Sequence, residues 1–155
     1  MKRTVVSLVV ALGAAFGGCG GTSTHVDSTD SSLHFSGQAR RVAAVVEDYS
    51  RSLGRHDFKR ICDVLYTPMN KQAHTGLVGG GCAKMLAADF GKARNVDFDV
   101  TMVRPYPSPN GFPGEPGRAM DAFIKIRGSF PNVAPNPGSF TLVLEGGRWR
   151  IASGG

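Results

Sequence analysis

Four side chains could supply acid–base chemistry, but none of them belongs to a recognisable catalytic motif. Tyr49 and His74 fall in predicted helices, and Asp97 and Asp121 fall in predicted strands. A histidine titrates near neutral pH, and a nearby carboxylate could act as general acid or base. A second histidine, His56, shares with His74 a position near a helix end, where a surface role is the competing interpretation. The chain has no nucleophile-elbow serine and no HExxH or CxxC arrangement.

The N-terminal residues have the pattern of an export signal. Two basic residues at positions 2 and 3 precede an apolar run over 5–16, which is shorter than the roughly 20 residues that span a bilayer. The sequence FGGC over 16–19 resembles the bacterial lipobox, in which the cysteine is lipidated and becomes the new N-terminus. We expect residues 1–18 to be a lipoprotein signal peptide and Cys19 to carry the lipid. A plain signal peptide with an incidental Cys19 is the alternative.

Residues 19–36 are predicted to be a flexible tether between the lipid and a single domain over 37–155. The segment is rich in Ser, Thr, Gly and Asp and has no apolar period. His25 and His34 lie in it, too far apart and with too few partners for a metal site. No metal or cofactor is expected elsewhere in the chain.

The three cysteines agree with an exported lipoprotein. If Cys19 is lipidated, Cys62 and Cys82 remain for one disulfide, which would form in the oxidising compartment outside the cytoplasm. The predictions of an oxidising compartment, a lipidated Cys19 and a disulfide are therefore consistent with one another.

The charge pattern does not favour nucleic-acid binding. Without the two basic residues of the signal, the formal net charge falls from +6 to +4, and the remaining basic residues are scattered along the chain. A nucleic-acid surface would need them clustered, with aromatic side chains between them. A solvated surface that tolerates an anionic membrane is the simpler interpretation.

Apolar periodicity predicts helices first and strands afterwards. A period of three to four is followed by a period of two, with Gly146-Gly147 as a two-residue hairpin turn. Helices are predicted over 38–53, 57–66, 69–75 and 82–93, and strands over 95–104, 119–130, 139–145 and 148–152.

Alternation assigns the strand residues to two faces of a sheet. The face expected to point towards the helices is almost wholly apolar: Val96, Phe98, Val100, Met102, Met120, Ala122, Ile124, Ile126, Phe140, Leu142, Leu144, Trp149 and Ile151. Val103, Phe123 and Val143 are expected on the outer face. A shift of one residue would bring Asp97, Asp99 and Asp121 inside, where buried charges would need partners.

Two motifs make the chain resemble the nuclear transport factor 2-like superfamily, which includes the SnoaL-like cyclases. They are LGRHD at 53–57, between the first two predicted helices, and EGGRWRI at 145–151, in the last hairpin. The resemblance implies an α+β fold in which N-terminal helices pack on a curved antiparallel sheet of about four strands around a cone-shaped cavity. It also implies that the outer sheet face can form a homodimer, and that the two remaining cysteines pair as in similar exported lipoproteins.

The expected function is that of a membrane-anchored, extracytoplasmic lipoprotein. Its domain would bind an envelope protein or an apolar small molecule without catalysis, because the face expected to line the cone carries no Asp–His pair. The alternative is an envelope enzyme of cyclase, isomerase or hydrolase type acting on a small apolar substrate, with Tyr49, His74, Asp97 and Asp121 as its candidates.

Overall fold

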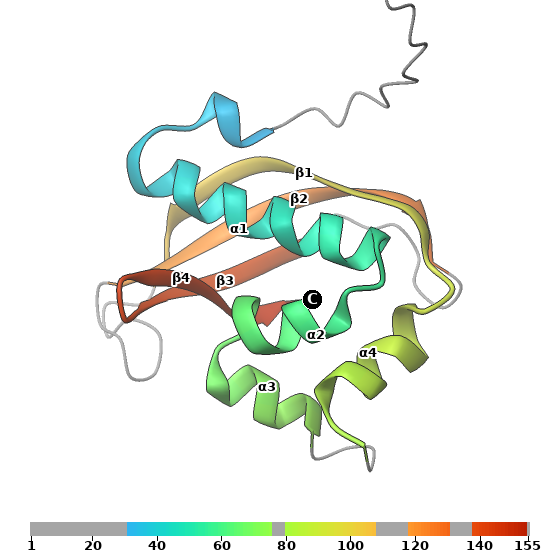
Figure 1. The fold of residues 1–155 in the computed structure, drawn as a ribbon. Coiled ribbons are helices and arrows are strands. Elements are labelled where there is room, and N and C mark those ends of the chain that lie inside the picture. Colours follow the sequence, from blue (N-terminus) through green and yellow to red (C-terminus); the bar gives the residue numbers. More distant parts are fainter. Residues whose placement is uncertain (1–30, 76–79, 108–117, 131–137, 155) are drawn as a thin grey trace, which may run out of the picture.

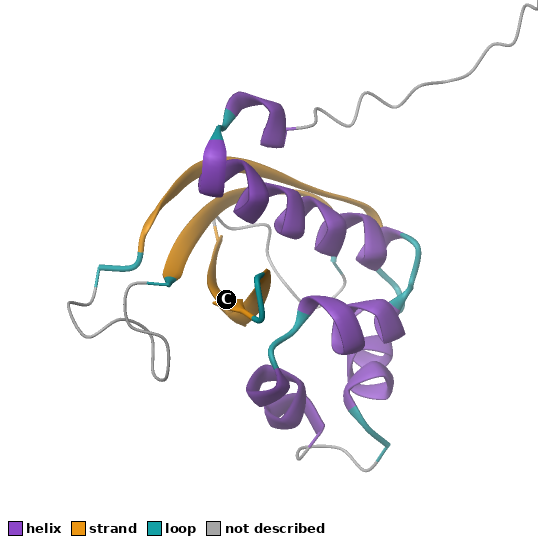
Figure 2. Cartoon of the chain, turned by 60° about the vertical axis from the view of Figure 1, so that its left-hand side comes forward, coloured by secondary structure: helices purple, strands orange, loops and turns teal. Residues whose placement is uncertain are grey.

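Helix α1 (Gly37–Gly54) lies across a curved antiparallel sheet in the computed structural model, which describes residues 31–75, 80–107, 118–130 and 138–154 (Figure 1). Its buried residues recur every three to four positions, so one side of the helix faces the sheet. Figure 2 shows the strands bending over α1, with the shorter helices gathered beside it. The predicted α+β architecture is therefore confirmed.

The sheet is a meander with the strand order β1-β2-β3-β4. Its strands are β1 (Arg94–Pro105), β2 (Ala119–Ser129), β3 (Gly138–Glu145) and β4 (Arg148–Gly154). The turn between β3 and β4 is the predicted Gly146-Gly147 pair, and both glycines have positive φ, at 55° and 78°. A two-residue hairpin of this kind needs positive φ at both positions, which glycine adopts without strain.

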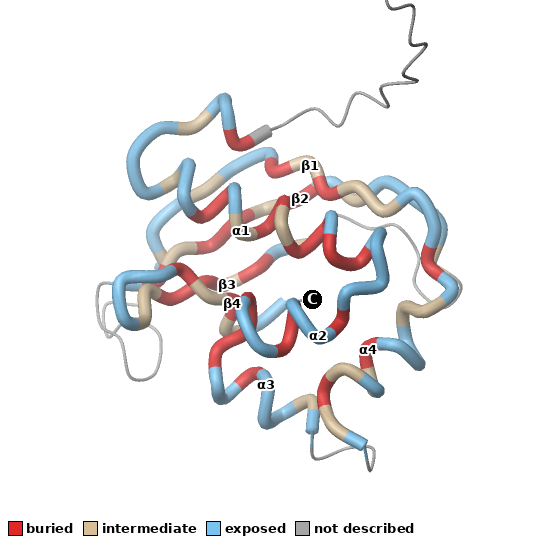
Figure 3. The backbone as a smooth tube through the Cα atoms, in the orientation of Figure 1, coloured by how far each residue is buried: buried red, intermediate tan, exposed pale blue. Residues whose placement is uncertain are grey.

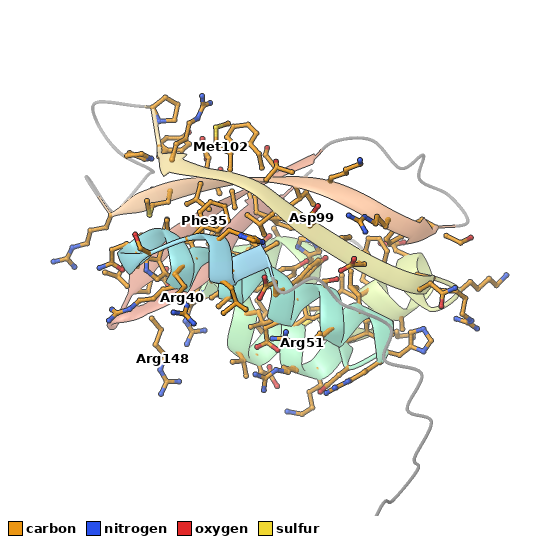
Figure 4. All side chains as sticks on the ribbon, turned by 90° about the horizontal axis from the view of Figure 1, so that it is seen from above. Phe35, Arg40, Arg51, Asp99, Met102 and Arg148 are labelled. Atoms are coloured by element: carbon orange, nitrogen blue, oxygen red, sulfur yellow. A yellow bond between two sulfur atoms is a disulfide. The ribbon has the colours of Figure 1, made fainter. Side chains whose placement is uncertain are left out.

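The apolar strand residues face α1 as predicted, with one correction in β1. Figure 3 shows the buried segments concentrated where α1 and the strands face each other. Val100 pairs with Ile124 but Met102 pairs with Phe123, so β1 has one extra residue there. This bulge reverses the alternation beyond it. The prediction that Met102 points inwards and Val103 outwards was therefore wrong: Val103 packs against the core, and Met102 is 43% exposed on the side of β1 away from α1 (Figure 4).

The end of the predicted tether is folded. Residues Ser31–His34 form a 3-10 helix, η1, and Ser32 is buried where its backbone N–H donates to the Glu47 carboxylate of α1. Phe35 packs against the core beside the start of α1 (Figure 4). An apolar side chain among polar residues thus anchors this segment against the domain. The predicted signal peptide, Cys19 and the tether up to residue 30 lie outside the described residues.

The helix predicted over 57–66 is a composite. Asp57 caps it, because its carboxylate accepts a hydrogen bond of 3.1 Å from the backbone N–H of Arg60. Only α2 (Phe58–Arg60) is α-helical, and η2 (Ile61–Leu65) is a π-helical turn. Helices α3 (Pro68–Thr75) and α4 (Cys82–Phe90) follow, and α4 is shorter than the predicted 82–93.

The predicted disulfide between Cys62 and Cys82 is confirmed, with the two Cα atoms 6.1 Å apart. It joins the π-helical turn η2 to the first residue of α4. Both cysteines are 3% exposed and belong to the core. The bridge therefore fixes α4 against the rest of the helical layer.

None of the helices among the described residues is both long and apolar enough to span a bilayer.

We expect Asp63 to contribute to the loss of stability in acid. Its carboxylate accepts hydrogen bonds of 2.6 Å from Lys59 and Lys71. These bonds, with the one from Lys59 as the largest cause, lower the pKa of Asp63 from 3.8 to about 2. Because the folded pKa is the lower one, the stabilisation is present above about pH 4 and is lost as the pH falls towards about 2.

Asp63→Asn should therefore weaken the dependence of the urea midpoint on pH between about 4 and about 2. Asp89→Asn on the exposed side of α4 is the control, because Asp89 has no ion pair among the described residues. An Asp63→Asn profile parallel to that of the unaltered protein would contradict the expectation.

Candidate functional site

A cavity of about 270 Å³ lies between the helices and the inner face of the sheet. Residues of α1, α3 and α4 line its wall, together with residues of all four strands. The lining residues are Tyr49, Leu53, Tyr66, Asn70, His74, Phe90, Phe98, Ile124, Ile126, Phe130, Phe140, Ile151 and Gly154. The wall is mostly aromatic and aliphatic, as in sites that bind apolar molecules.

Tyr49 stands at the centre of the aromatic wall. It lies on the buried side of α1, and its ring packs against Tyr66, Phe98 and Phe140 at centroid distances of 6.0, 5.9 and 5.2 Å. The contact with Phe140 is edge-to-face, which is favoured by the opposed charge of ring edge and ring face. Tyr49 therefore belongs to the core as well as to the cavity.

The hydroxyl groups of Tyr49 and Tyr66 share a hydrogen bond of 3.3 Å. Burial raises the pKa of Tyr49 well above its usual value, and the neighbouring Tyr66 raises it further. Burial also raises the pKa of Tyr66. Both side chains are therefore neutral phenols at physiological pH. Each hydroxyl carries one proton, and only one of the two protons is used in the hydrogen bond between them.

The π-helical turn η2 and strand β4 hold Tyr66 in place. The backbone N–H of Tyr66 donates to the Ile61 carbonyl at 2.9 Å, and the residue is extended and forms a parallel bridge with Ile151. Thr67 N–H then donates to the Ile151 carbonyl at 2.9 Å. A π turn inserts a residue relative to an α-helix and so redirects the side chains that follow it.

Helix α3 adds two more polar groups to the same wall. Thr67 accepts a hydrogen bond of 3.1 Å from the N–H of Asn70 and so caps the helix. The Asn70 side-chain amide donates to the Ile151 carbonyl at 3.3 Å, which joins α3 to β4. His74 follows one turn later, with its ring centroid 5.0 Å from that of Tyr66.

The hydrogen bond of His74 fixes which ring nitrogen carries the proton in its neutral form. His74 Nδ1 lies 2.8 Å from the Asn70 carbonyl oxygen, which can only accept. Nδ1 is therefore the donor, and Nε2 has a free lone pair. Among the described residues no side chain bonds Nε2, and no fully buried side-chain polar atom there lacks a partner. Nε2 is thus an accessible acceptor.

Two of the four predicted acid–base residues meet in this cavity, and two do not. Tyr49 and His74 both line it. Asp97 stands opposite Arg127 on the outer face of the sheet, and Asp121 accepts a hydrogen bond of 2.9 Å from Thr141 there. The alternative strand phase, which would have brought these carboxylates inside, is wrong. His56 lies exposed at the turn after α1, away from the cavity lining.

Sequence reasoning missed Tyr66 and Asn70 as site residues. Tyr66 was predicted only as the end of a helix, and the π turn that redirects it has no clear sequence signal. Pro68 after Thr67 is typical of a helix start, and a polar residue at the third helical position, Asn70, could have been recognised as the partner of that cap.

The described lining contains no Asp, Glu, Lys or Arg. Across the described residues, no three His, Cys, Asp or Glu side chains are grouped so that they could hold a metal ion. The site therefore offers a mostly apolar pocket with hydrogen-bonding groups from tyrosine, asparagine and histidine in its wall.

The chain matches no protein-family model, no curated protein and no solved structure.

Proposed function

We propose that this protein is a lipid-anchored, extracytoplasmic binding protein whose domain holds a compact apolar molecule in the cavity. The observation that carries the proposal is the concave aromatic and aliphatic lining, which would recover the hydrophobic free energy of burying a ligand. A volume of about 270 Å³ is slightly below the usual range of about 300–1,000 Å³ for drug-sized ligands, so one or two rings would fill it.

The location is supported by the sequence before the domain and by the bridge inside it. The apolar run and Cys19 support lipid anchoring, and the Cys62–Cys82 disulfide supports an oxidising compartment. Mass spectrometry of the protein isolated from cell membranes tests the anchor. A diacylglyceryl-modified Cys19 as the first residue supports it, and an unmodified N-terminus elsewhere contradicts it.

The order of elements supports a nuclear transport factor 2-like relationship. The helices come first, an antiparallel meander follows, and α1 crosses the concave side of a curved sheet with a cavity beside it. In this family the outer face of the sheet can pair two copies, so a homodimer remains part of the proposal. Val143 and Asp121 on that face are already buried within one chain. Met102 and Phe123 are therefore the apolar side chains on the outer face that a second copy could cover.

Filling the cavity should weaken the binding of an apolar probe. Ile126 lines the cavity and is only half-buried, so Ile126→Trp can occupy the space without being forced into a closed core. We expect the affinity for indane, measured by calorimetry, to fall at least about tenfold, because the apolar area that the ligand buries is already covered. Unchanged affinity would contradict the proposal.

The matched control is Lys125→Trp. Lys125 is the preceding residue of β2 and points to the opposite, exposed face. It adds the same side chain to the same strand without entering the cavity, so indane should bind it as it binds the unaltered protein.

An enzyme of isomerase or cyclase type is the second candidate, favoured by the free Nε2 of His74 in a cavity that two neutral tyrosines also line. A base beside hydrogen-bond donors can remove a proton next to a carbonyl group. Exchange of the α-protons of indanone for deuterium, accelerated by the protein and lost in His74→Phe, would favour this candidate. Binding of indanone without exchange would favour simple binding.

A further inference from the structure

The polar atoms of the cavity all lie on one side of it. Tyr66 stands between the other two groups: its hydroxyl is 3.3 Å from that of Tyr49, and its ring is 5.0 Å from that of His74. The rest of the described lining is hydrocarbon, apart from the polar Asn70, whose amide is used in a bond to β4. A ligand would therefore have one polar end and one apolar body.

The two tyrosines leave one donor for a ligand. When two hydroxyls share one hydrogen bond, one proton lies in that bond and the other is free. No further hydrogen bond of either hydroxyl is found among the described residues. The pair therefore presents an O–H group towards the cavity, whichever tyrosine donates.

His74 leaves one acceptor next to that donor. Its Nδ1 proton is held by the Asn70 carbonyl, so the neutral ring presents the lone pair of Nε2. The rings of His74 and Tyr66 are neighbours, with a centroid distance of 5.0 Å, and both side chains line the same cavity.

A donor and an acceptor side by side select among ligand groups. A carboxylate would be buried without a cationic partner in the described lining, and an ammonium group without an anionic one, so both are disfavoured. A hydrocarbon would leave the phenol proton and Nε2 desolvated without partners. An ether or ketone can accept from tyrosine but cannot donate to histidine. A hydroxyl group does both.

We infer that the cavity takes a neutral alcohol with a compact ring body, whose hydroxyl accepts from the Tyr49–Tyr66 pair and donates to His74 Nε2. The inference rests on the proposed binding function and adds the class of ligand to it. It assigns His74 as the residue that distinguishes an alcohol from its ether.

Four compounds with one ring body test it: indane, its alcohol indanol, the methyl ether of that alcohol, and the carboxylate at the same carbon. Calorimetry on the unaltered chain should show indanol binding about tenfold tighter than the ether, because the ether leaves Nε2 unpaired. His74→Phe should remove this preference by weakening indanol alone. Replacing both Tyr49 and Tyr66 by phenylalanine should weaken both indanol and the ether, since both accept from the tyrosine pair, whereas a single remaining hydroxyl can still donate.

His74→Gln guards against a merely structural effect, because its amide oxygen can still accept and should retain part of the preference for indanol. Equal losses for indane and indanol in His74→Phe, or tightest binding of the carboxylate, would overturn the alcohol inference and leave the binding function standing. Failure of all four compounds to bind the unaltered chain would overturn both.

Discussion

Tyr49→Ala is expected to cause the largest loss of stability, about 3–5 kcal/mol, the range typical of truncating a large buried aromatic side chain. Tyr49 is 5% exposed and contacts three other aromatic rings. Removing its ring would join new empty space to the existing cavity, and the surrounding strands cannot close over it because their register is fixed by the sheet. Urea denaturation measures the loss.

Tyr49→Phe is the matched control, because it keeps the ring and removes only the hydroxyl that bonds Tyr66. It should cost about 1 kcal/mol, the usual net value of one hydrogen bond. Equal losses for the two variants would mean that the hydroxyl, and not the packing, carries the contribution of Tyr49. A loss below about 1 kcal/mol for Tyr49→Ala would contradict its placement in the core.

Replacing both cysteines of the bridge by serine should cost about 3 kcal/mol. The disulfide closes a loop with a sequence separation of 20, and the chain-entropy model gives about 3 kcal/mol for a loop of this size. Since Cys62 and Cys82 lie in η2 and α4, the loss should come from freeing the helical layer and not the sheet. The melting temperature, measured with and without reductant, reports it.

The unaltered protein should melt at a lower temperature in reductant, and the double serine variant should be indifferent to it. The relative affinities for the indane compounds should be the same in both proteins, because neither cysteine lines the cavity. Equal melting temperatures of the unaltered protein under both conditions would refute a stabilising bridge, and a changed ligand order would show that it shapes the site.

The regular elements could be predicted because their burial is periodic. Helix α1 and the inner residues of β2, β3 and β4 follow the period of their apolar residues. The assignment of strand residues to the two faces was wrong at Met102 and Val103, where one extra residue in β1 reversed the alternation. A bulge is set by pairing with the neighbouring strand, and so it leaves no trace in the period of its own strand.

Two of the four polar residues that line the cavity could be predicted from the sequence, and the other two could not. Tyr49 and His74 were recognised as candidates because both side chains can take part in acid–base chemistry and both fall in predicted helices. Tyr66 is positioned by its bridge with Ile151, and Asn70 by its hydrogen bond to the Ile151 carbonyl. Ile151 follows each of them by more than 80 residues. Contacts over that distance are tertiary, and a local pattern does not contain them.

The central claim is that a compact apolar ligand occupies the space between α1, α3 and the sheet. The most direct measurement is nuclear Overhauser contacts from bound indanol to side chains of the isotope-labelled protein. We predict contacts from its ring protons to Phe98, Ile124 and Phe140, and contacts from the proton on its hydroxyl-bearing carbon to Tyr66 and His74. Contacts to Met102 and Phe123 on the outer sheet face, with none to Phe98 or Phe140, would contradict the claim.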